Sequence, residues 1–362
     1  MERSRVTMAD VARRAGVSHT AVSLILNNRV GTRLSPEAVE RVRRAAEELG
    51  YRPNLTARAL STRRSHAIGF VSDRTATERY ASALIHGALV EARARGYVLF
   101  IAETEGDPDA ERQAFDALVD RQVDGLIFAT SWSRKLELPE PPAHTRLVLL
   151  NAVSDHVPTA ILPDEERGGR EMVDLLLDAG RHDDVVLIGR THTQPIDQWY
   201  TPTVQRRVEG IWASLDAHGV TPIAEIPCRR WYAEEGYNAM RDLLTSGVRP
   251  RGVICLNDRL AFGVYRALNE SGMSVPEDTS VVSFDDDEIA QYLQPQLTTA
   301  ALPYDQMGTL AVQLLLDSDA EEREYLVEMP IRVRGSIQPV ATAGTAPNDG
   351  SPRSSVEPVR RA

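Results

Sequence analysis

The residues with the clearest chemical meaning lie near the N-terminus, on one face of a short predicted helix. Ser18 is placed to cap this helix, and Ala21, Val22 and Ile25 recur at the spacing of a buried helical face. The opposite face carries side chains that can hydrogen-bond to base edges, or contact a thymine methyl group, in a DNA major groove. These side chains are His19, Thr20, Ser23 and Leu24.

A second predicted helix precedes this one and would hold it in place. Thr7, followed three residues later by Asp10, is typical of a helix start, and Gly16 allows the tight turn after the helix. A third helix is predicted after Ser35, with Pro36 at its first position. The pattern favours a helix-turn-helix unit, although a helical hairpin that merely packs would show the same apolar spacing.

Charge separates this N-terminal unit from the rest of the chain. Residues 1–64 hold 13 arginines and six acidic residues, whereas the remaining residues hold 28 basic and 46 acidic ones. A basic head can bind phosphates while an acidic body stays away from the duplex. The asymmetry therefore favours nucleic-acid binding by the N-terminal unit.

The composition argues against several other classes of protein. No apolar run approaches the roughly 20 residues of a membrane span, and the start, MERSRVTMAD, lacks the apolar segment of a secretory signal. We therefore expect a cytoplasmic protein without a membrane partner, with Cys228 and Cys255 as buried free thiols. The histidines show no metal-ligand spacing, and the sequence has no glycine-rich phosphate loop or nucleophile elbow. We expect no metal, no cofactor and no enzyme activity.

Beyond residue 67, short apolar strands alternate with amphipathic helices. This alternation is typical of parallel sheets covered by helices on both faces. Two series of strands, between residues 68 and 162 and between 185 and 284, predict two similar lobes with a cleft at the carboxyl ends of the strands. The predicted fold class is an N-terminal all-α helix-turn-helix head plus an α/β two-lobed body with parallel sheets.

Several segments resemble the lactose- and purine-repressor (LacI/GalR) family of transcription regulators. They are TMADVARRAGVSHTAVSLILN, YRPN, ARALS, IGFV, GYVLFIAET, VDGLIF, ERGGREMVDLLLDAG, RRVEGI and CLNDRLAFGVYRALNESGMSVPEDTSVVSFDDDEIAQYLQPQLTT. The resemblance covers about residues 6–340. It implies a periplasmic-binding-protein-like body that binds a small-molecule effector between its lobes and forms a homodimer, and a near-palindromic double-stranded operator as the DNA partner.

The resemblance also divides the chain. It implies a helix-turn-helix domain over 6–52, a hinge helix and linker over 53–66, and an effector-binding and dimerisation domain over 67–340. The first lobe would comprise about 67–163 and 294–322, and the second about 164–293 and 323–340. Residues 341–362 are expected to be a disordered tail, and since this tail lacks a leucine heptad we expect a dimer and not a tetramer.

Particular residues would contact DNA or effector if the resemblance holds. Leu60 would wedge into the central minor groove and kink the duplex, while Arg58 would bind phosphate. Trp231 would stack on the effector ring, Arg207 would fork onto its hydroxyls or a carboxylate, and Asp285 would accept its hydroxyl hydrogen bonds. The DNA-binding set is Thr7, Ser18, His19, Thr20, Ser23, Leu24, Asn27, Asn54, Arg58 and Leu60. The effector-binding set is Tyr80, Asn151, Thr203, Arg207, Trp231, Asn257 and Asp285.

Some alternatives stay open at this point. Asp258 and Asp286 could touch the effector, but their positions favour caps of the helices that follow them. An aromatic plate with a polar rim suits a sugar, whereas a purine or nucleoside would also stack on it. A transport-type solute-binding protein would share the two-lobed body but would lack the basic helical head. The main hypothesis is therefore a ligand-controlled DNA-binding repressor.

Overall fold

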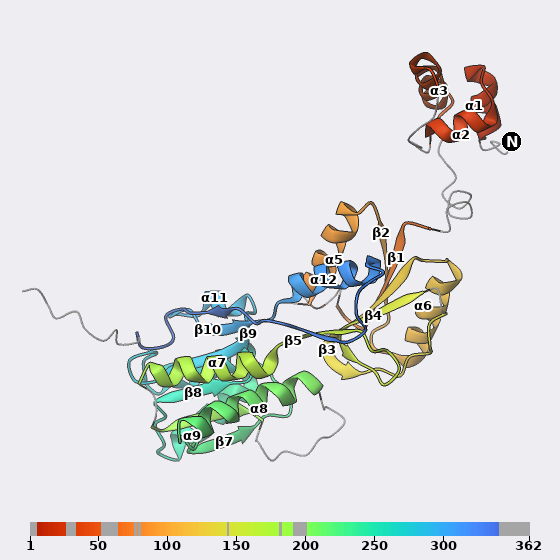
Figure 1. Ribbon diagram of the computed structural model, residues 1–362. Helices are drawn as coiled ribbons and strands as arrows, with labels where there is room; N and C mark the ends of the chain where they lie inside the picture. Colours follow the sequence, from red (N-terminus) through yellow and green to blue (C-terminus); the bar gives the residue numbers. More distant parts are fainter. Residues whose placement is uncertain are drawn as a thin grey trace, which may run out of the picture.

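A computed structural model of the chain shows a small helical head and a larger body of two lobes, each built on one sheet (Figure 1). Among the described residues, no helix is long and apolar enough to cross a membrane. The residues that the structure describes are 6–26, 34–51, 64–75, 78, 81–142, 145–180, 183–190 and 201–339.

Three helices form the head: α1 (Met8–Ala15), α2 (His19–Leu26) and α3 (Pro36–Glu48). A capping box starts α1, because Thr7 Oγ1 accepts a hydrogen bond from the Asp10 N–H at 3.3 Å and the Asp10 carboxylate accepts one from the Thr7 N–H at 2.9 Å. The turn after α1 is left-handed, with a φ of 67° at Gly16, where glycine is favoured. One valine from each helix is fully buried where the three helices meet: Val11, Val22 and Val42.

The first lobe contains a parallel sheet in the order β2-β1-β3-β4-β5-β11. Helices α5 (Ser82–Ala94) and α12 (Tyr304–Leu316) pack on one face, and α6 (Pro108–Asp120) packs on the other. Because both faces are covered, the central strands are buried over most of their length, as parallel strands between helices usually are. The strands are β1 (Ala67–Ser72), β2 (Val98–Glu103), β3 (Gly125–Lys135), β4 (Arg146–Val153), β5 (Ala160–Pro163) and β11 (Glu324–Val327).

The second lobe repeats this arrangement in the order β7-β6-β8-β9-β10-β12, where β12 runs antiparallel to β10. In both lobes the strand order reverses beside the first strand, and ligands of such folds bind at the carboxyl ends of the strands near this reversal. The strands are β6 (Val185–Gly189), β7 (Ala224–Pro227), β8 (Gly252–Cys255), β9 (Ser280–Asp285), β10 (Thr298–Ala301) and β12 (Ile331–Arg332). The helices are α7 (Glu165–Asp178), α8 (Pro202–Ala217), α9 (Ala233–Thr245), α10 (Asp258–Glu270) and α11 (Ile289–Tyr292).

Helices α7 and α8 approach each other so closely that glycine is required at their crossing. A Cβ atom added to Gly210 would overlap the backbone carbonyl of Glu166, and one added to Gly169 would overlap the carbonyl of Arg207. The two backbones are therefore in direct contact. This close crossing brings the first turn of α7 beside the first turns of α8.

The chain passes between the lobes three times: after β5, after β10 and after β11. The second and third passages lie several residues after the approximate bounds, 294 and 322, that the resemblance implies. Residues 298–301 belong to the second sheet, since β10 pairs with β9, and residues 324–327 belong to the first, since β11 pairs with β5. Both strands are short and have no long apolar run. Backbone hydrogen bonding to a neighbouring strand therefore determines which sheet each of them joins. The expected tail, and residues 52–63 of the expected hinge, lie outside the described residues.

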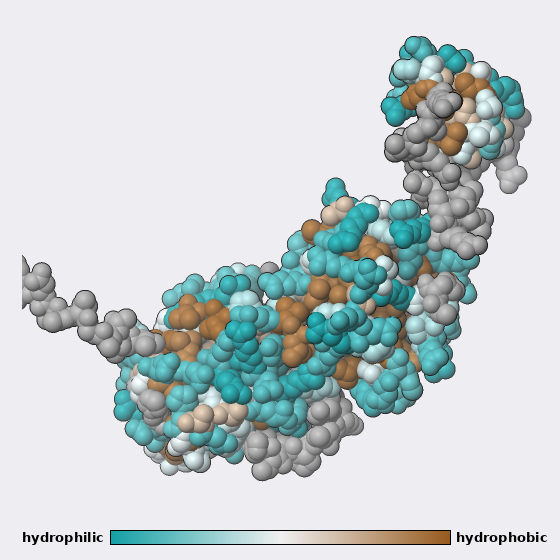
Figure 2. Space-filling view, viewed as in Figure 1, coloured by the Kyte–Doolittle hydropathy of each residue, from teal (hydrophilic) through white to brown (hydrophobic). Residues whose placement is uncertain are grey.

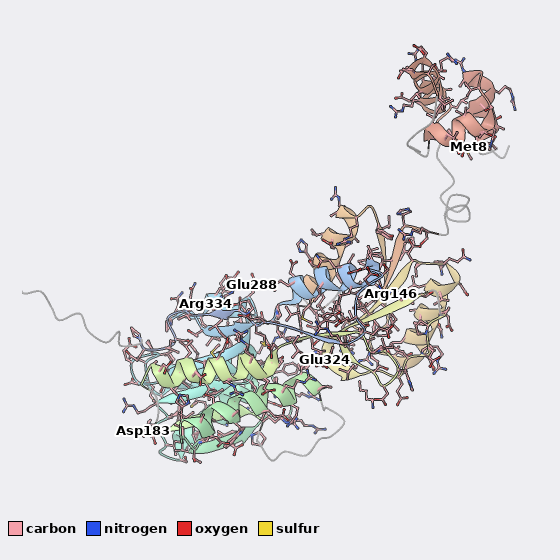
Figure 3. The ribbon with its side chains drawn as sticks, in the orientation of Figure 1. Met8, Arg146, Asp183, Glu288, Glu324 and Arg334 are labelled. Carbon is pink, nitrogen blue, oxygen red and sulfur yellow. The ribbon has the colours of Figure 1, made fainter. Side chains whose placement is uncertain are left out.

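An ion pair also joins the lobes beside these passages. Arg206 of α8 binds both carboxylate oxygens of Glu324 of β11, at 2.7 and 3.0 Å. Glu324 lies where the two lobes meet (Figure 3). The pair therefore links the second lobe to the last strand of the first.

Candidate functional site

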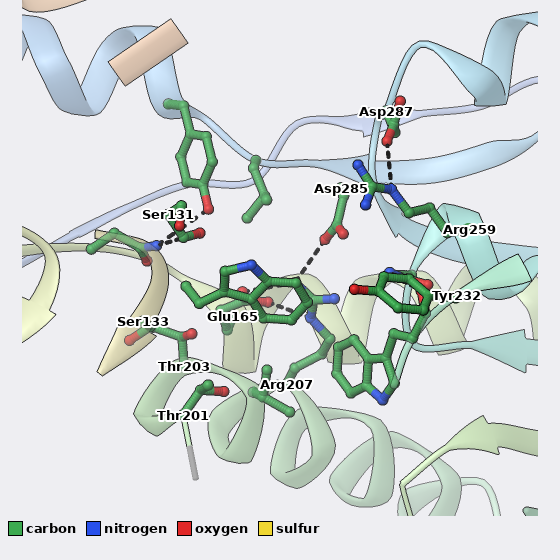
Figure 4. A pocket seen from close by; sticks show the side chains of 17 residues that line it. Ser131, Ser133, Glu165, Thr201, Thr203, Arg207, Tyr232, Arg259, Asp285 and Asp287 are labelled. Atoms are coloured by element: carbon green, nitrogen blue, oxygen red, sulfur yellow. Dashed lines mark hydrogen bonds and ion pairs between the residues drawn. The ribbon is translucent and has the colours of Figure 1, made fainter. Parts of the chain in front are cut away.

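A pocket lies between the lobes, at the carboxyl ends of strands from both sheets (Figure 4). It opens to solvent. The first lobe contributes residues of β3 and β4, and the second contributes residues of α7, α8, α10 and β9. The described lining residues are Ser131, Trp132, Ser133, Asn151, Glu165, Thr201, Thr203, Val204, Arg207, Trp231, Tyr232, Asn257, Arg259, Asp285, Asp287, Leu302 and Tyr304.

Arg207 is buried at the base of this pocket and is held by acids on two sides. Its Nε donates to Glu165 Oε2 at 2.7 Å, and its Nη2 donates to Glu165 Oε1 at 2.8 Å and to Asp285 Oδ1 at 3.1 Å. Its Nη1 donates to the Leu256 carbonyl, and the Phe284 ring centre lies 4.6 Å from its Cζ. Burial lowers the pKa of Arg207, but the two carboxylates outweigh burial and raise the pKa above its usual value. The guanidinium is therefore permanently charged.

The local sequence explains how Glu165 reaches Arg207. Asp164 caps α7 by accepting a hydrogen bond from the Arg167 N–H at 3.3 Å, which places Glu165 at the first helical position. The glycine crossing described above brings this turn against α8. Both side chains are almost completely buried, with 2% of Glu165 and 2% of Arg207 exposed.

Asp285 ends β9 at the pocket, as predicted, with a left-handed φ of 104°. The buried carboxylate of Asp258 supports this strand end. It accepts hydrogen bonds from Ser283 Oγ at 2.6 Å, from Thr299 Oγ1 at 2.8 Å and from the Asp287 N–H at 2.7 Å. Asp258 thus holds in place the turn that carries Asp285 and Asp287, two acids of the pocket lining.

The expectation that Asp258 and Asp286 cap helices is wrong. The cap of α10 is Asn257, whose Oδ1 accepts from the Leu260 N–H at 2.9 Å, so Asp258 is left free to bind the strand ends. Asp286 binds Arg334 Nη2 at 2.6 Å, and the residue before α11 is Glu288. Asp286 is absent from the described pocket lining.

The two amide side chains that were predicted to bind effector line the pocket, but both already form hydrogen bonds to other groups of the protein. Asn151, 2% exposed, donates from Nδ2 to the Thr130 carbonyl at 2.9 Å and to the Tyr304 hydroxyl at 3.3 Å. Asn257 donates from Nδ2 to the Trp231 carbonyl at 3.2 Å. These amides shape the pocket wall, and any contact with a ligand would share their remaining oxygen lone pairs.

Aromatic side chains face the pocket from both lobes. Trp231 donates from Nε1 to the Gly189 carbonyl at 3.3 Å, which fixes its indole ring in the second lobe. Its neighbour Tyr232 is 53% exposed, and Trp132 of the first lobe is 46% exposed. The pocket therefore has apolar plates on two sides.

Two hydroxyl oxygens of the pocket lining, those of Ser133 and Thr201, have no hydrogen-bond partner among the described residues. Ser133 is 4% exposed. Thr203, the predicted hydroxyl, is buried in the first turn of α8. Hydroxyls of this kind can each donate one hydrogen bond to a ligand and accept others.

Sequence reasoning missed most of the other lining residues, among them Trp132, Glu165 and Arg259. Trp132 lies in the second half of β3, and a tryptophan soon after an apolar strand was the available signal. Glu165 looked like an ordinary first-turn acid of a helix. Arg259 binds Asp287 at 3.3 Å and lies 3.9 Å from Glu78 of the first lobe.

In the head, α2 presents the predicted DNA-facing residues. His19 and Thr20 are exposed, Ser23 and Leu24 are half-buried, and Ser18 Oγ accepts a hydrogen bond from the Ala21 N–H at 3.2 Å. The Thr7 hydroxyl, exposed at the start of α1, donates to Asp10 at 2.7 Å. The remaining predicted residues lie outside the described ones: Asn27, Asn54, Arg58, Leu60 and, for the pocket, Tyr80.

Both parts of the chain match known families. Residues 7–54 match the family of bacterial regulatory proteins named lacI, and residues 173–337 match the periplasmic binding protein-like domain. The chain is similar to the ribose operon repressor of Escherichia coli strain K12. The two sequences are 33% identical over 317 residues, which cover 86% of this chain and 92% of that protein.

Solved structures share the fold of most of the chain. A lac repressor dimer bound to operator and the anti-inducer ONPF has a TM-score of 0.75 and 25% identity, covering 92% of this chain and 99% of that one. A LacI-family transcriptional regulator from Enterococcus faecium with bound ribose has a TM-score of 0.58 and 26% identity. The match covers 75% of this chain and 99% of that one.

Proposed function

Because this chain belongs to the lacI family of bacterial regulatory proteins, we propose that it is a transcriptional repressor whose operator affinity is controlled by a sugar bound between its lobes. The observation that carries the proposal is the pocket, which is lined by aromatic side chains from both lobes and by buried polar groups. A sugar has apolar ring faces and hydroxyls at its rim, and such a pocket is complementary to both.

The DNA-binding part of the proposal rests on α2. His19 and Thr20 contact base edges, and Leu24 packs on a base or a methyl group. Ser23 and Asn27 add further DNA contacts, while Thr7, Ser18, Asn54 and Arg58 bind the DNA backbone and Leu60 wedges into the minor groove. Two copies of α2 in a dimer read a near-palindromic operator.

A homodimer is supported by exposed apolar side chains on one edge of each lobe. In the first lobe they lie on α5 and on the edge strand β2, and in the second on α10 and α11. Figure 2 shows brown areas on both lobes, at the edge where Figure 1 places α11 in one lobe and α5 with α12 in the other. Large exposed apolar areas of this kind usually mark protein contacts. The residues are Leu89, Val90, Val98, Phe100, Ile101, Phe262 and Tyr292.

The proposal is tested by electrophoretic mobility shifts of the full chain on DNA from upstream of its own gene. A panel of mono- and oligosaccharides, with purines and nucleosides as competitors, is first screened by thermal shift. We expect one sugar to raise the melting temperature and to change operator affinity. Specific operator binding that responds to a purine and to no sugar would replace the sugar with the alternative effector. The absence of any sequence-specific shift would contradict the repressor function itself.

Thr20→Ala tests the orientation of α2. Each lost base contact is worth about 1–3 kcal/mol of discrimination, so we expect a changed preference among half-site sequences. Uniformly weaker binding, with the same order of preference, would show that Thr20 does not contact bases.

A further inference from the structure

We infer that the pocket selects uncharged ring compounds and rejects anionic ones, and that the carboxylates beside its two arginines, Glu165 at Arg207 and Asp287 at Arg259, set this preference. The inference rests on the proposed function, because it narrows the class of effector that the pocket takes. Sugars occur as neutral aldoses, as uronates and as phosphate esters. The arrangement of charges in the pocket separates the first class from the other two.

Glu165 removes the site at which an anion would bind. A free arginine binds a carboxylate or a phosphate through two parallel N–H groups. In this pocket Glu165 itself occupies that geometry, with oxygens 2.7 Å from Nε and 2.8 Å from Nη2 of Arg207. The anion-binding edge of the guanidinium is therefore already filled by a residue of the protein.

The remaining donors of Arg207 are also mostly used. Its second Nη2 hydrogen is directed to Asp285 Oδ1 at 3.1 Å, and one Nη1 hydrogen is directed to the Leu256 carbonyl. A guanidinium has five N–H donors, so the described contacts leave one donor for a ligand. One donor can bind a hydroxyl oxygen, but it cannot form the fork that anions prefer.

The second arginine of the described lining also lies beside carboxylates, although among the described contacts no carboxylate binds it through two N–H groups. Arg259 binds Asp287 at 3.3 Å and lies 3.9 Å from Glu78 across the cleft. Figure 4 shows Asp287 beside Arg259 at one side of the pocket and Asp285 beside Arg207 at its base. Among the described lining residues, three carboxylates therefore face two guanidiniums.

A negative charge placed in this pocket would meet an excess of like charge at short range. Asp285 keeps a second carboxylate oxygen for which the described residues provide no hydrogen-bond partner, and 21% of its side chain is exposed. That oxygen can accept a hydrogen bond from a hydroxyl but repels a carboxylate or a phosphate. Like charges brought together at a binding site disfavour the wrong partner strongly. Neutral hydroxyls meet no such penalty.

The test compares neutral sugars with their anionic counterparts by isothermal titration calorimetry on the full chain at pH 7. The pairs are D-ribose with D-ribose 5-phosphate and D-galactose with D-galacturonate. We expect at least one neutral sugar to bind, and to bind about tenfold or more tightly than its anionic partner. An anionic member that binds as tightly as its neutral partner, or more tightly, would overturn the inference while leaving a sugar-controlled repressor intact. If no member of either pair binds and no sugar alters operator affinity, the sugar part of the proposed function fails as well.

Glu165→Gln isolates the contribution of Glu165. Glutamine keeps the shape of glutamate but removes its charge, so Arg207 becomes available and we expect binding of D-galacturonate or D-ribose 5-phosphate to strengthen about tenfold. Glu166→Gln is the matched control, since this neighbour on α7 is 55% exposed and pairs outward with Arg170. Glu166→Gln is expected to keep the parental selectivity. If the two variants behave alike, Glu165 does not set the preference.

A second variant keeps the test decisive if Glu165→Gln does not fold. Asp287→Asn releases Arg259 at the pocket side without touching the buried Glu165–Arg207 pair. It is expected to increase binding of the same anions, and thermal melting establishes that it is folded. A folded Asp287→Asn protein with the parental selectivity would contradict the inference.

Discussion

A single buried carboxylate supports the strand end that carries the pocket acids. Asp258 is fully buried, faces no cation among the described residues, and is stabilised by two hydroxyl groups and one backbone N–H. Burial, followed by the nearby charge of Asp285, raises the pKa of Asp258 well above its ordinary 3.8. Its ionisation in the folded protein is therefore less favourable than in the unfolded chain.

This shift of the Asp258 pKa predicts a pH dependence of stability. Between pH 3.8 and the raised pKa, the folded state holds a proton that the unfolded state has lost, so this group's contribution to stability decreases as the pH rises. Asp258→Asn cannot ionise, so the melting temperature of the parent minus that of Asp258→Asn should fall as the pH increases through this window. A constant difference from pH 4 to pH 8 would contradict the raised pKa. Asp258→Ala is expected to be less stable than Asp258→Asn by about 1–3 kcal/mol for each orphaned donor.

A residue of the pocket could be predicted from the sequence where a nearby motif or strand end identifies it. It could not be predicted where its role depends on contact between two segments that are distant in the sequence. Trp231 and Arg207 follow from the family resemblance and Asp285 also from its position at a strand end, and the structure places all three in one pocket. The pairing of Glu165 with Arg207 depends on the crossing of two helices, and it has no local signal. For the same reason, the sequence left Arg207 free to bind a carboxylate.

At the scale of elements, the crossing of α7 and α8 determines the base of the pocket. Gly210→Ala would place a methyl group on the Glu166 carbonyl, so the helices must separate or bend. We expect a loss of stability of about 1–3 kcal/mol or more, as in other overpacked sites, together with weaker ligand binding. Glu209→Ala, at the exposed neighbouring position, is the control and is expected to affect neither. Equal melting temperatures of Gly210→Ala and the parent would show that the crossing tolerates a larger residue.

The segment that leads from the head into the body is anchored to the first sheet. The Asp124 carboxylate accepts hydrogen bonds from the Ser65 N–H at 2.6 Å, the Ser65 hydroxyl at 2.9 Å and the His66 N–H at 3.0 Å. Such an anchor ties the position of the linker to that of the first lobe.

Asp124→Ala should therefore weaken the coupling between effector binding in the pocket and operator binding by the head. We expect operator affinity to respond less to a bound sugar, while affinity for that sugar in the absence of DNA is unchanged. Mobility shifts with and without sugar, and calorimetry, measure the two quantities. Asp120→Ala, an exposed acid at the end of α6, is the control. A parental response in Asp124→Ala would remove this anchor from the coupling.

Strands with strong apolar patterns were predictable, whereas short strands at the lobe junction were not. The central strands β1, β6 and β9 are buried throughout or nearly so, and their valine- and isoleucine-rich runs identify them. β10 and β11 have four residues each, and their place in a sheet depends on backbone pairing with strands distant in sequence. The second and third passages between the lobes differ from the implied bounds for this reason, whereas the first agrees with them.

At the scale of the whole molecule, the exposed edge of the first lobe predicts a contact between two copies. Phe100 is 46% exposed on the edge strand β2. Phe100→Glu should weaken the dimer by placing a charge in an apolar contact, and sedimentation velocity should show an increased fraction of monomer. Val333→Glu, at a 61% exposed position after β12, is the control and should sediment like the parent. An unchanged dimer in Phe100→Glu would move the contact to another surface.

The three passages between the lobes have a consequence for synthesis on the ribosome. Strands β1 to β5 emerge early, but α12, which covers one face of their sheet, and β11, which completes its edge, are translated near the end. The first lobe therefore cannot close its core while most of the body is being made, since that closure spans the whole second lobe. The head has a separate core and can fold as soon as it emerges. A nascent chain would thus carry a folded DNA-reading surface before it has a pocket with which to be regulated.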